Sequence, residues 1–313
     1  MVRVSASALA TLLGCPHRFL LERILHFSEP AARPSTDVID PIAYGALFHA
    51  AAERFFQASG RALCAHDGDL EQFVAHAQAI AAEQFDQLRD EYPLRGIDAT
   101  DRERQRLLRQ IEYLVRDEWH RPVREYLFSE LAFGAPAPVR LDLEGGALYV
   151  RGAIDRLDRL PTGGLSVRDL KTGRVHDLGE DPMNAARDLQ IGVYILVLET
   201  RQHGLGADVP AQVTEAAYVH PSAAQAEDRS FAGAELDLLR RRTRGWLLVA
   251  HRLLSAGAFP RTPNPDDCRY CPFVAACGDG AQQRSATKLR GLLPEHPLHA
   301  FARFKEENRR DDG

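Results

Sequence analysis

Two residues near the middle of the chain, Asp169 and Lys171, have types and spacing that could do chemistry together. They lie two positions apart in VRDLKTG, which has the pattern of a buried β-strand, so both side chains point to the same face. A carboxylate and an ammonium are costly to remove from water, which makes a chemical role worth considering. The alternative is a salt bridge at the end of the strand, because ion pairs without a chemical role also perturb charges.

A third charged residue, Asp155, lies one predicted strand earlier, in RGAIDRLDR, and a glycine-containing turn separates the two strands. Neighbouring residues on paired strands lie about 5 Å apart, so the carboxylates of Asp155 and Asp169 would repel unless a cation lay between them. Carboxylate oxygens with open coordination positions suit Mg²⁺ or Mn²⁺, which also bind phosphate oxygens. Beside such a metal, Lys171 would orient or deprotonate an attacking water and offset the charge on the phosphorus centre.

The elements that would position these residues are a helix-rich first third followed by short strands. Apolar residues recur every three or four positions in residues 43–59, 70–90 and 102–127, which predicts helices. From 128 to 171, short β-like runs separated by glycine and proline turns predict an antiparallel meander. The remaining predicted elements are a helix over 185–203, a strand in VTEAAYVHP and a long helix over 232–256.

The composition is that of an ordinary soluble globular protein. The chain has 313 residues, 45% of them hydrophobic and 27% charged, and no apolar run approaches the roughly 18 residues of a membrane helix. The net charge of -5 provides no overall attraction to nucleic acid. The run of Arg240, Arg241, Arg242 and Arg244 gives weak support for a polyanionic partner.

The first residues contain LLGC, which resembles the cleavage box of a bacterial lipoprotein signal. The stretch before it is short, has one basic residue and is interrupted by Ser5, Ser7 and Thr11, unlike the firm apolar region of such signals. We therefore expect a cytoplasmic protein without a membrane partner.

The acids and the lysine together resemble a known family. Gly152-x-x-Asp155-Arg156 followed by Asp169-x-Lys171 resembles the core of the PD-(D/E)XK nuclease superfamily, in its RecB-like branch. The resemblance implies an α/β fold. It has a central mixed β-sheet of restriction-endonuclease-like type flanked by helices, a helical N-terminal portion and a C-terminal cysteine segment.

Further motifs support this resemblance. Gly45, His49 and Glu53 recur every four residues on one helix face and are similar to the Gly-x-x-x-His-x-x-x-Glu helix of RecB-like nucleases, whose histidine joins the metal site. The alternatives are a histidine without a special role and, for Glu53, a surface charge. Glu130 falls where the family often has an acid that opens the nuclease sheet. Glu53 and Glu130 are thus candidates for supporting the metal ligands.

A later helix carries Gln190 and Tyr194, four positions apart on one face. The pair resembles the Gln-x-x-x-Tyr helix that follows the catalytic strand in this family, where these residues lie beside the lysine and near the DNA. The alternative for Tyr194 is a place in the hydrophobic core of an amphipathic helix.

The cysteines form a separate set. Cys268, Cys271 and Cys277 have the spacing C-x2-C-x5-C, and Cys15 would complete a four-thiolate site, whereas Cys64 stands apart. Disulfides fit poorly, because there is no convincing export signal and the chain is long enough to fold without them. Structural zinc remains an alternative.

The resemblance favours iron and sulfur over zinc. An early Cys-Pro-x-x-Phe and a late C-x2-C-x5-C are similar to those of CRISPR-adaptation exonucleases and AddB-type nuclease domains, in which four cysteines hold a [4Fe-4S] cluster. We therefore expect residues 1–280 to form one nuclease domain whose ends the cluster joins, although a prior of about 150 residues per domain suggests two. Residues 281–313 are expected to be a partly disordered tail.

The expected function is a Mg²⁺- or Mn²⁺-dependent deoxyribonuclease, an exonuclease acting on single strands or duplex ends in DNA repair, recombination or CRISPR adaptation. The resemblance implies that His49, Asp155, Asp169 and the Leu170 carbonyl hold the metal, while Lys171 serves the attacking water. A helicase or another recombination or adaptation protein would be the partner. The alternative is a catalytically silent subunit that binds DNA ends for a larger complex.

Overall fold

The structure is a computed structural model. It describes residues 3–28, 37–91, 94, 96–173, 183–200, 212–221 and 227–307. The helices are α1 (Ala6–Gly14), α2 (Pro16–Phe19), α3 (Pro41–Cys64), α4 (Leu70–Glu91), α5 (Gly96–Trp119), α6 (Ala185–Glu199), α7 (Gly233–Ser255), α8 (Val274–Cys277), α9 (Ala281–Leu289) and α10 (His299–Glu307), with a π-helical turn at Leu20–Ile24 and a 3-10 turn at Asp266–Cys268. The strands are β1 (Arg3–Val4), β2 (Glu125–Phe133), β3 (Val139–Leu143), β4 (Gly146–Val150), β5 (Gly152–Arg159), β6 (Leu165–Leu170), β7 (Val213–His220) and β8 (Glu227–Ala232).

The central sheet has five strands in the order β2-β5-β6-β7-β8. All neighbouring pairs are antiparallel except β6 and β7, which run parallel. A parallel pair needs a crossover connection, and α6 lies between these two strands in the chain. The expected mixed sheet flanked by helices is confirmed.

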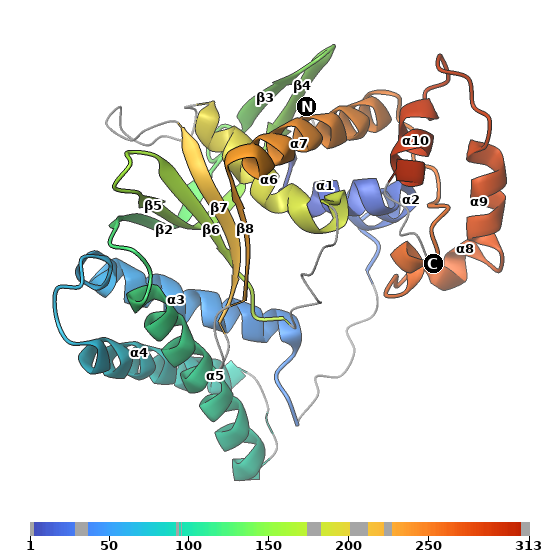
Figure 1. The fold of residues 1–313 in the computed structure, drawn as a ribbon. Helices are drawn as coiled ribbons and strands as arrows, with labels where there is room; N and C mark the ends of the chain where they lie inside the picture. The colour runs from blue at the N-terminus through green and yellow to red at the C-terminus, as the bar shows by residue number, and fades with distance from the viewer. Residues whose placement is uncertain are drawn as a thin grey trace.

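Helices cover both faces of this sheet (Figure 1). A hydrophobic cluster that includes Leu9, Tyr194 and Trp246 joins α1, α6 and α7 to one face, and a second cluster joins α3, α4 and α5 to the other. Within the first cluster, Gly192 allows α6 to approach α7 closely, because a Cβ there would lie 2.0 Å from Thr243 Oγ1. The packing fixes where α6 presents its polar residues.

The long helix α3 begins at a clear N-terminal signal. The Asp40 side chain accepts hydrogen bonds from Ile42 N at 2.8 Å and Ala43 N at 3.3 Å, and Pro41 occupies the first helical position. This cap lies two turns before His49, so it helps to set where that side chain meets the sheet.

Two sequence expectations are corrected. The predicted single meander is wrong, because β3 and β4 leave the central sheet and form a three-stranded sheet with β1 in the order β1-β4-β3, while β2 pairs directly with β5. The helix expected over 102–127 ends at Trp119, and β2 starts at Glu125. Pro122 between them cannot continue a helix.

The segment expected to be a tail is ordered over residues 281–307. It forms α9 and α10, and Phe301, Ala302 and Phe304 of α10 are buried in the first hydrophobic cluster. The spacing of these three residues puts them on one helix face, which packs against α7. Residues 308–313 lie outside the described residues.

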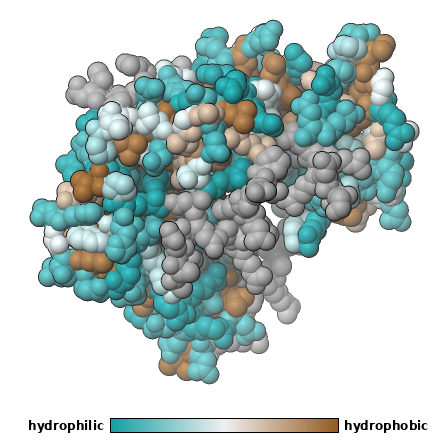
Figure 2. Space-filling view, viewed as in Figure 1, coloured by the Kyte–Doolittle hydropathy of each residue, from teal (hydrophilic) through white to brown (hydrophobic). Residues whose placement is uncertain are grey.

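None of the described helices is both long and apolar enough to cross a bilayer. Figure 2 shows a face that is mostly hydrophilic, with hydrophobic residues scattered over it. Such scattered residues are normal on globular proteins and need no partner.

Candidate metal centre

The two acids of the predicted hairpin lie at the same level of neighbouring strands. Arg156 of β5 pairs with Arg168 of β6, so the register brings Asp155 and Asp169 opposite each other one residue further along. Asp155 Oδ2 accepts a hydrogen bond of 2.7 Å from Leu170 N. Asp155 is 9% exposed and Asp169 is fully buried, so two carboxylates are held together away from water.

Lys171 extends from the end of the same strand and is held from two sides. Its Nζ lies 2.5 Å from Asp169 Oδ2 and donates to Gln190 Oε1 at 3.0 Å. Gln190 Nε2 in turn donates to Tyr194 OH at 2.8 Å. The lysine, glutamine and tyrosine therefore form one hydrogen-bonded chain, and the ion pair of Lys171 joins it to the Asp169 carboxylate.

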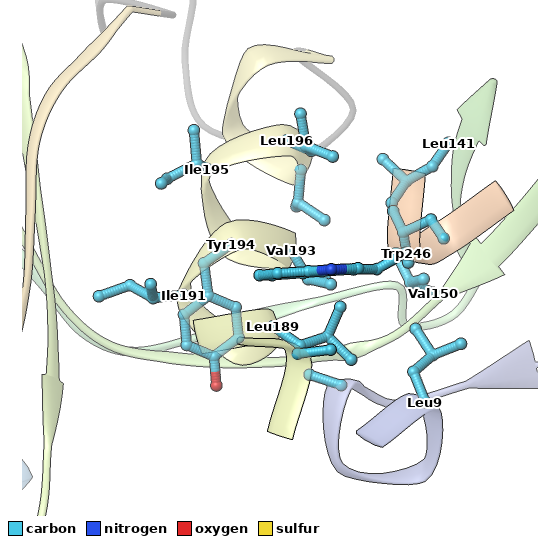
Figure 3. Close-up of a cluster of buried hydrophobic side chains, with 14 of the residues drawn as sticks. Leu9, Leu141, Val150, Leu189, Ile191, Val193, Tyr194, Ile195, Leu196 and Trp246 are labelled. Carbon is cyan, nitrogen blue, oxygen red and sulfur yellow. The ribbon is translucent and has the colours of Figure 1, made fainter. Parts of the chain in front are cut away.

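Tyr194 is buried in the hydrophobic core and also contacts Gln190. Its ring lies among the buried side chains of α6, and its hydroxyl points away from Trp246 (Figure 3). It is 5% exposed. The residue is part of the core and also ends the polar chain from Lys171.

His49 of α3 and Glu130 of β2 complete the cluster from the other side. His49 Nδ1 lies 3.2 Å from Glu130 Oε1 and 3.7 Å from Asp155 Oδ2. One potential ligand atom of each of these three residues lies within 4.8 Å of the others. An imidazole and carboxylate oxygens at this separation suit a divalent cation.

Glu130 has an unusual backbone for a strand residue. Its φ is 47°, in the left-handed region, although Ser129 and Leu131 on either side keep their pairing with β5. This conformation costs a non-glycine residue roughly 1–3 kcal/mol and persists only where the surroundings enforce it. The local distortion accompanies a carboxylate that meets His49.

Burial and the neighbouring charges shift the pKa values of the acids and the histidine at this centre. Burial and the neighbouring Asp169 raise the pKa of Asp155 to about 8, and burial also raises the pKa of Asp169. Burial acts to lower the pKa of His49, but the hydrogen bond to Glu130 and the charge of Asp155 outweigh it and raise that pKa. All three shifts would be reduced by a bound cation.

In the described part of the chain, one carboxylate oxygen at this centre lacks a hydrogen-bond donor. Asp169 Oδ1 is buried and has no hydrogen-bond donor among the described residues. A buried carboxylate oxygen without a donor carries the desolvation cost of its charge, and metal coordination removes that cost. The residues present therefore fit Mg²⁺ or Mn²⁺.

The expected residues differ in how they meet this centre. Asp155, Asp169, Lys171, Gln190, Tyr194, His49 and Glu130 are brought together by the contacts given above. Glu53 lies one turn beyond His49, and its recorded hydrogen bond comes from Gln57 of its own helix at 2.9 Å. Sequence reasoning missed Tyr218 of β7, which pairs with Asp169, because strand register is not visible in the sequence.

The cysteines form a second assembly near α2 and α8. Cys15, Cys268, Cys271 and Cys277 line one small cavity. Burial raises the pKa of the Cys15 thiol, while the backbone N–H groups of Arg18 and Thr262 act to lower it. All five cysteines are free in the structure. Cys64 lies in the other hydrophobic cluster and accepts a hydrogen bond from Arg156 Nη2 at 2.9 Å.

Comparison with known proteins decides the family. A family model of the PD-(D/E)XK nuclease superfamily matches residues 3–278. The chain belongs to the PD-(D/E)XK nuclease superfamily. The matched residues of this PD-(D/E)XK protein include the whole central sheet and the four cysteines around the cavity. Membership implies a nuclease that uses a divalent metal, with DNA as its substrate.

Other comparisons with this PD-(D/E)XK protein add little. No curated protein matches the chain. A solved structure described as "Crystal structure of SSO0001" is 12% identical, with a TM-score of 0.32, over 84% of this chain and 93% of that one. At that TM-score the similarity carries no argument.

Proposed function

We propose that this PD-(D/E)XK protein is a Mg²⁺- or Mn²⁺-dependent exonuclease that hydrolyses phosphodiester bonds of single-stranded DNA or duplex ends. The observation that carries the proposal is the convergence of His49, Asp155 and Asp169 with Lys171 at the end of β6. Separate elements bring these residues together, although the two buried carboxylates repel each other in the absence of a cation.

The residues that would hold the metal are His49, Asp155, Asp169 and the Leu170 carbonyl, with Glu130 supporting His49. When bound, the metal supplies Lewis acidity and lowers the pKa of a water. The Lys171 ammonium, fixed between Asp169 and Gln190, would orient the attacking water and offset the charge on the phosphate. Tyr194 holds the Gln190 amide in the orientation that faces the lysine.

A [4Fe-4S] cluster held by Cys15, Cys268, Cys271 and Cys277 is part of the proposal. Its support is the shared cavity, which brings together a cysteine from the N-terminal end and three from the C-terminal end. Four thiolates also suit zinc, so metal analysis separates the two. About one zinc without iron or sulfide would refute the cluster and leave a metal clasp.

The wider assignment rests on the same residues. We infer a place in the RecB-like branch, with DNA repair, recombination or CRISPR adaptation as the pathway and a helicase or adaptation protein as the partner. The competing function is a silent DNA-end-binding subunit. The presence of all three charged residues argues against it, because Lys171 pairs with Asp169, Asp155 accepts from the backbone of Leu170 between them, and a binding module needs no such cluster.

The proposal is tested with protein purified without oxygen. An absorbance scan and iron analysis report the cluster, and labelled single strands and duplexes with free or blocked ends report cleavage. We expect cleavage with Mn²⁺ from free ends and none with a chelator. Binding of DNA ends without cleavage under any divalent metal would instead establish the silent subunit.

A further inference from the structure

Tyr218 of β7 lies directly beside the candidate metal centre, although it is not a candidate metal ligand. It pairs with Asp169 in the parallel register of β6 and β7, and it is 3% exposed. The Lys171 Nζ lies 5.4 Å from the centre of its ring. An ammonium at this distance is attracted by an aromatic ring, so the ring supports the lysine on a third side.

The Tyr218 hydroxyl has a more specific position. It donates to Arg187 O at 2.7 Å and accepts from Ile191 N at 3.2 Å. These are the two groups, four residues apart, that a regular α-helix joins to each other. The hydroxyl therefore inserts into the backbone ladder of α6 at the turn that carries Gln190.

The start of α6 is also anchored by its neighbours. Asn184 caps the helix by accepting from Arg187 N, and Asp188 accepts from Asn184 N. Arg229 of β8 donates to both carboxylate oxygens of Asp188, at 2.9 and 3.2 Å. Because these contacts hold the first turn, the contact with Tyr218 sets the position of the next turn.

We propose that Tyr218 is a positioning residue of the nuclease reaction, which places Lys171 with its ring and Gln190 with its hydroxyl. This inference rests on the proposed function of Lys171. The Lys171 side chain is 35% exposed and has several rotatable bonds, so its ammonium needs support on more than one side to stay at Asp169. Tyr218 is paired with Asp169 of β6, and its hydroxyl contacts α6, which carries Gln190.

The test compares Tyr218→Phe, which removes the hydroxyl alone, with Gln190→Ala and the double variant. If Tyr218 acts through α6, Tyr218→Phe lowers kcat about 10- to 100-fold, the range expected for a small misplacement. KM for the labelled strand and the affinity for Mn²⁺ stay within about twofold of wild type, because the metal ligands are unchanged. The double variant is then no slower than Gln190→Ala.

Tyr44→Phe is the matched control. Tyr44 is also buried, and its hydroxyl donates to Gln110 Oε1 at 2.7 Å, so this bond joins α3 to α5 and makes no contact with α6. A merely structural role for Tyr218 predicts similar losses of melting temperature in both variants and effects that multiply with Gln190→Ala. That result would overturn the inference.

Hydrogen exchange provides a readout independent of activity. We expect faster exchange in the peptide covering residues 185–191 of Tyr218→Phe, with unchanged exchange in α3. Equal exchange rates of that peptide in wild type and Tyr218→Phe would refute the insertion of the Tyr218 hydroxyl into α6. If wild type is inactive but hydrogen exchange still differs between wild type and Tyr218→Phe, the proposed function fails while the contact of Tyr218 with α6 stands. The two failures are therefore distinguishable.

Discussion

Asp155 Oδ2 accepts a hydrogen bond from the Leu170 backbone N–H at 2.7 Å, so the carboxylate of β5 is fastened to the strand that carries Asp169. The bond holds the two acids together even without a metal. Their proximity is therefore built into the hairpin, and it has consequences for stability as well as for chemistry.

The first prediction concerns the pH dependence of the metal-free protein. Burial and Asp169 raise the pKa of Asp155 to about 8, from an ordinary value of 3.8. Because the folded state then binds the proton more tightly, this residue stabilises the fold below about pH 4 and loses that contribution as pH rises through about 8. We expect the melting temperature of Asp155→Asn to exceed that of wild type by a margin that grows as the pH rises over this range.

The measurement is thermal unfolding in a chelator at several pH values. Asparagine keeps an oxygen that can accept from Leu170, so the hydrogen bond is retained while the charge is lost. Saturating Mn²⁺ should raise the melting temperature of wild type at pH 8 more than that of the variant. A difference in melting temperature between wild type and Asp155→Asn that does not change with pH would contradict this explanation of the role of Asp155.

The second prediction separates catalysis from metal binding. Lys171→Ala should lower kcat about 100-fold or more, because the group that orients the water is lost. Mn²⁺ affinity should be kept, since an ammonium is not a ligand. Lys288→Ala, in α9, is the matched control and should retain wild-type rates. A large loss of Mn²⁺ binding in Lys171→Ala would show that its role has been misassigned.

The third prediction concerns the cysteine clasp. Cys15→Ser should remove the absorbance expected near 400 nm, lower the melting temperature by several degrees and make both ends of the chain sensitive to protease, because a long closed loop is opened. Cys64→Ser should do none of these, since serine can still accept from Arg156. A Cys15→Ser protein with full iron content would refute the clasp.

The fourth prediction concerns the buried cluster of charged residues around Glu118. Glu118 is fully buried and pairs with Arg124, Arg156 and Arg168. Burial acts to raise its pKa, but these arginines outweigh burial and hold it well below the ordinary value. Glu118→Gln should lower the free energy of unfolding by about 3–5 kcal/mol, because buried arginine charges lose their partner.

The pH dependence of this cluster has the opposite sign to that of Asp155. A lowered pKa stabilises the fold above the ordinary value of 4.5 and loses this contribution as pH falls. Urea unfolding of Glu118→Gln at pH 7 and at acid pH measures both effects. Glu71→Gln, which breaks an exposed pair with Arg116, is the control and should change little. Small and equal changes in the free energy of unfolding of Glu118→Gln and Glu71→Gln would show that the buried cluster does not stabilise the fold.

Short motifs and the family resemblance that they carry led to most of the candidate centre. Asp169 and Lys171 share a strand face, Gln190 and Tyr194 share a helix face, and both periods are set by backbone geometry alone. The short turn between β5 and β6 explains why Asp155 could be joined to them. The central mixed sheet followed from the family resemblance that these motifs carry.

The rest depended on contacts that spacing does not encode. The left-handed φ of Glu130 and the insertion of Tyr218 into α6 arise from register between distant strands. β3 and β4 lie outside the central sheet, and β4 pairs with β1, more than a hundred residues earlier in the chain. The burial of Phe301, in the segment expected to be a partly disordered tail, depends on contacts with distant residues of the first hydrophobic cluster.

The most direct test of the central claim is cleavage of an end-labelled single strand by wild type and Asp169→Ala, purified in parallel and assayed with Mn²⁺ and with a chelator. The account predicts that the chelator stops wild type, that Asp169→Ala falls to the level of that metal-free control, and that its metal-free melting temperature is unchanged or raised, since one of two repelling carboxylates is gone. Cleavage by Asp169→Ala within a few-fold of wild type would contradict the assignment of this centre.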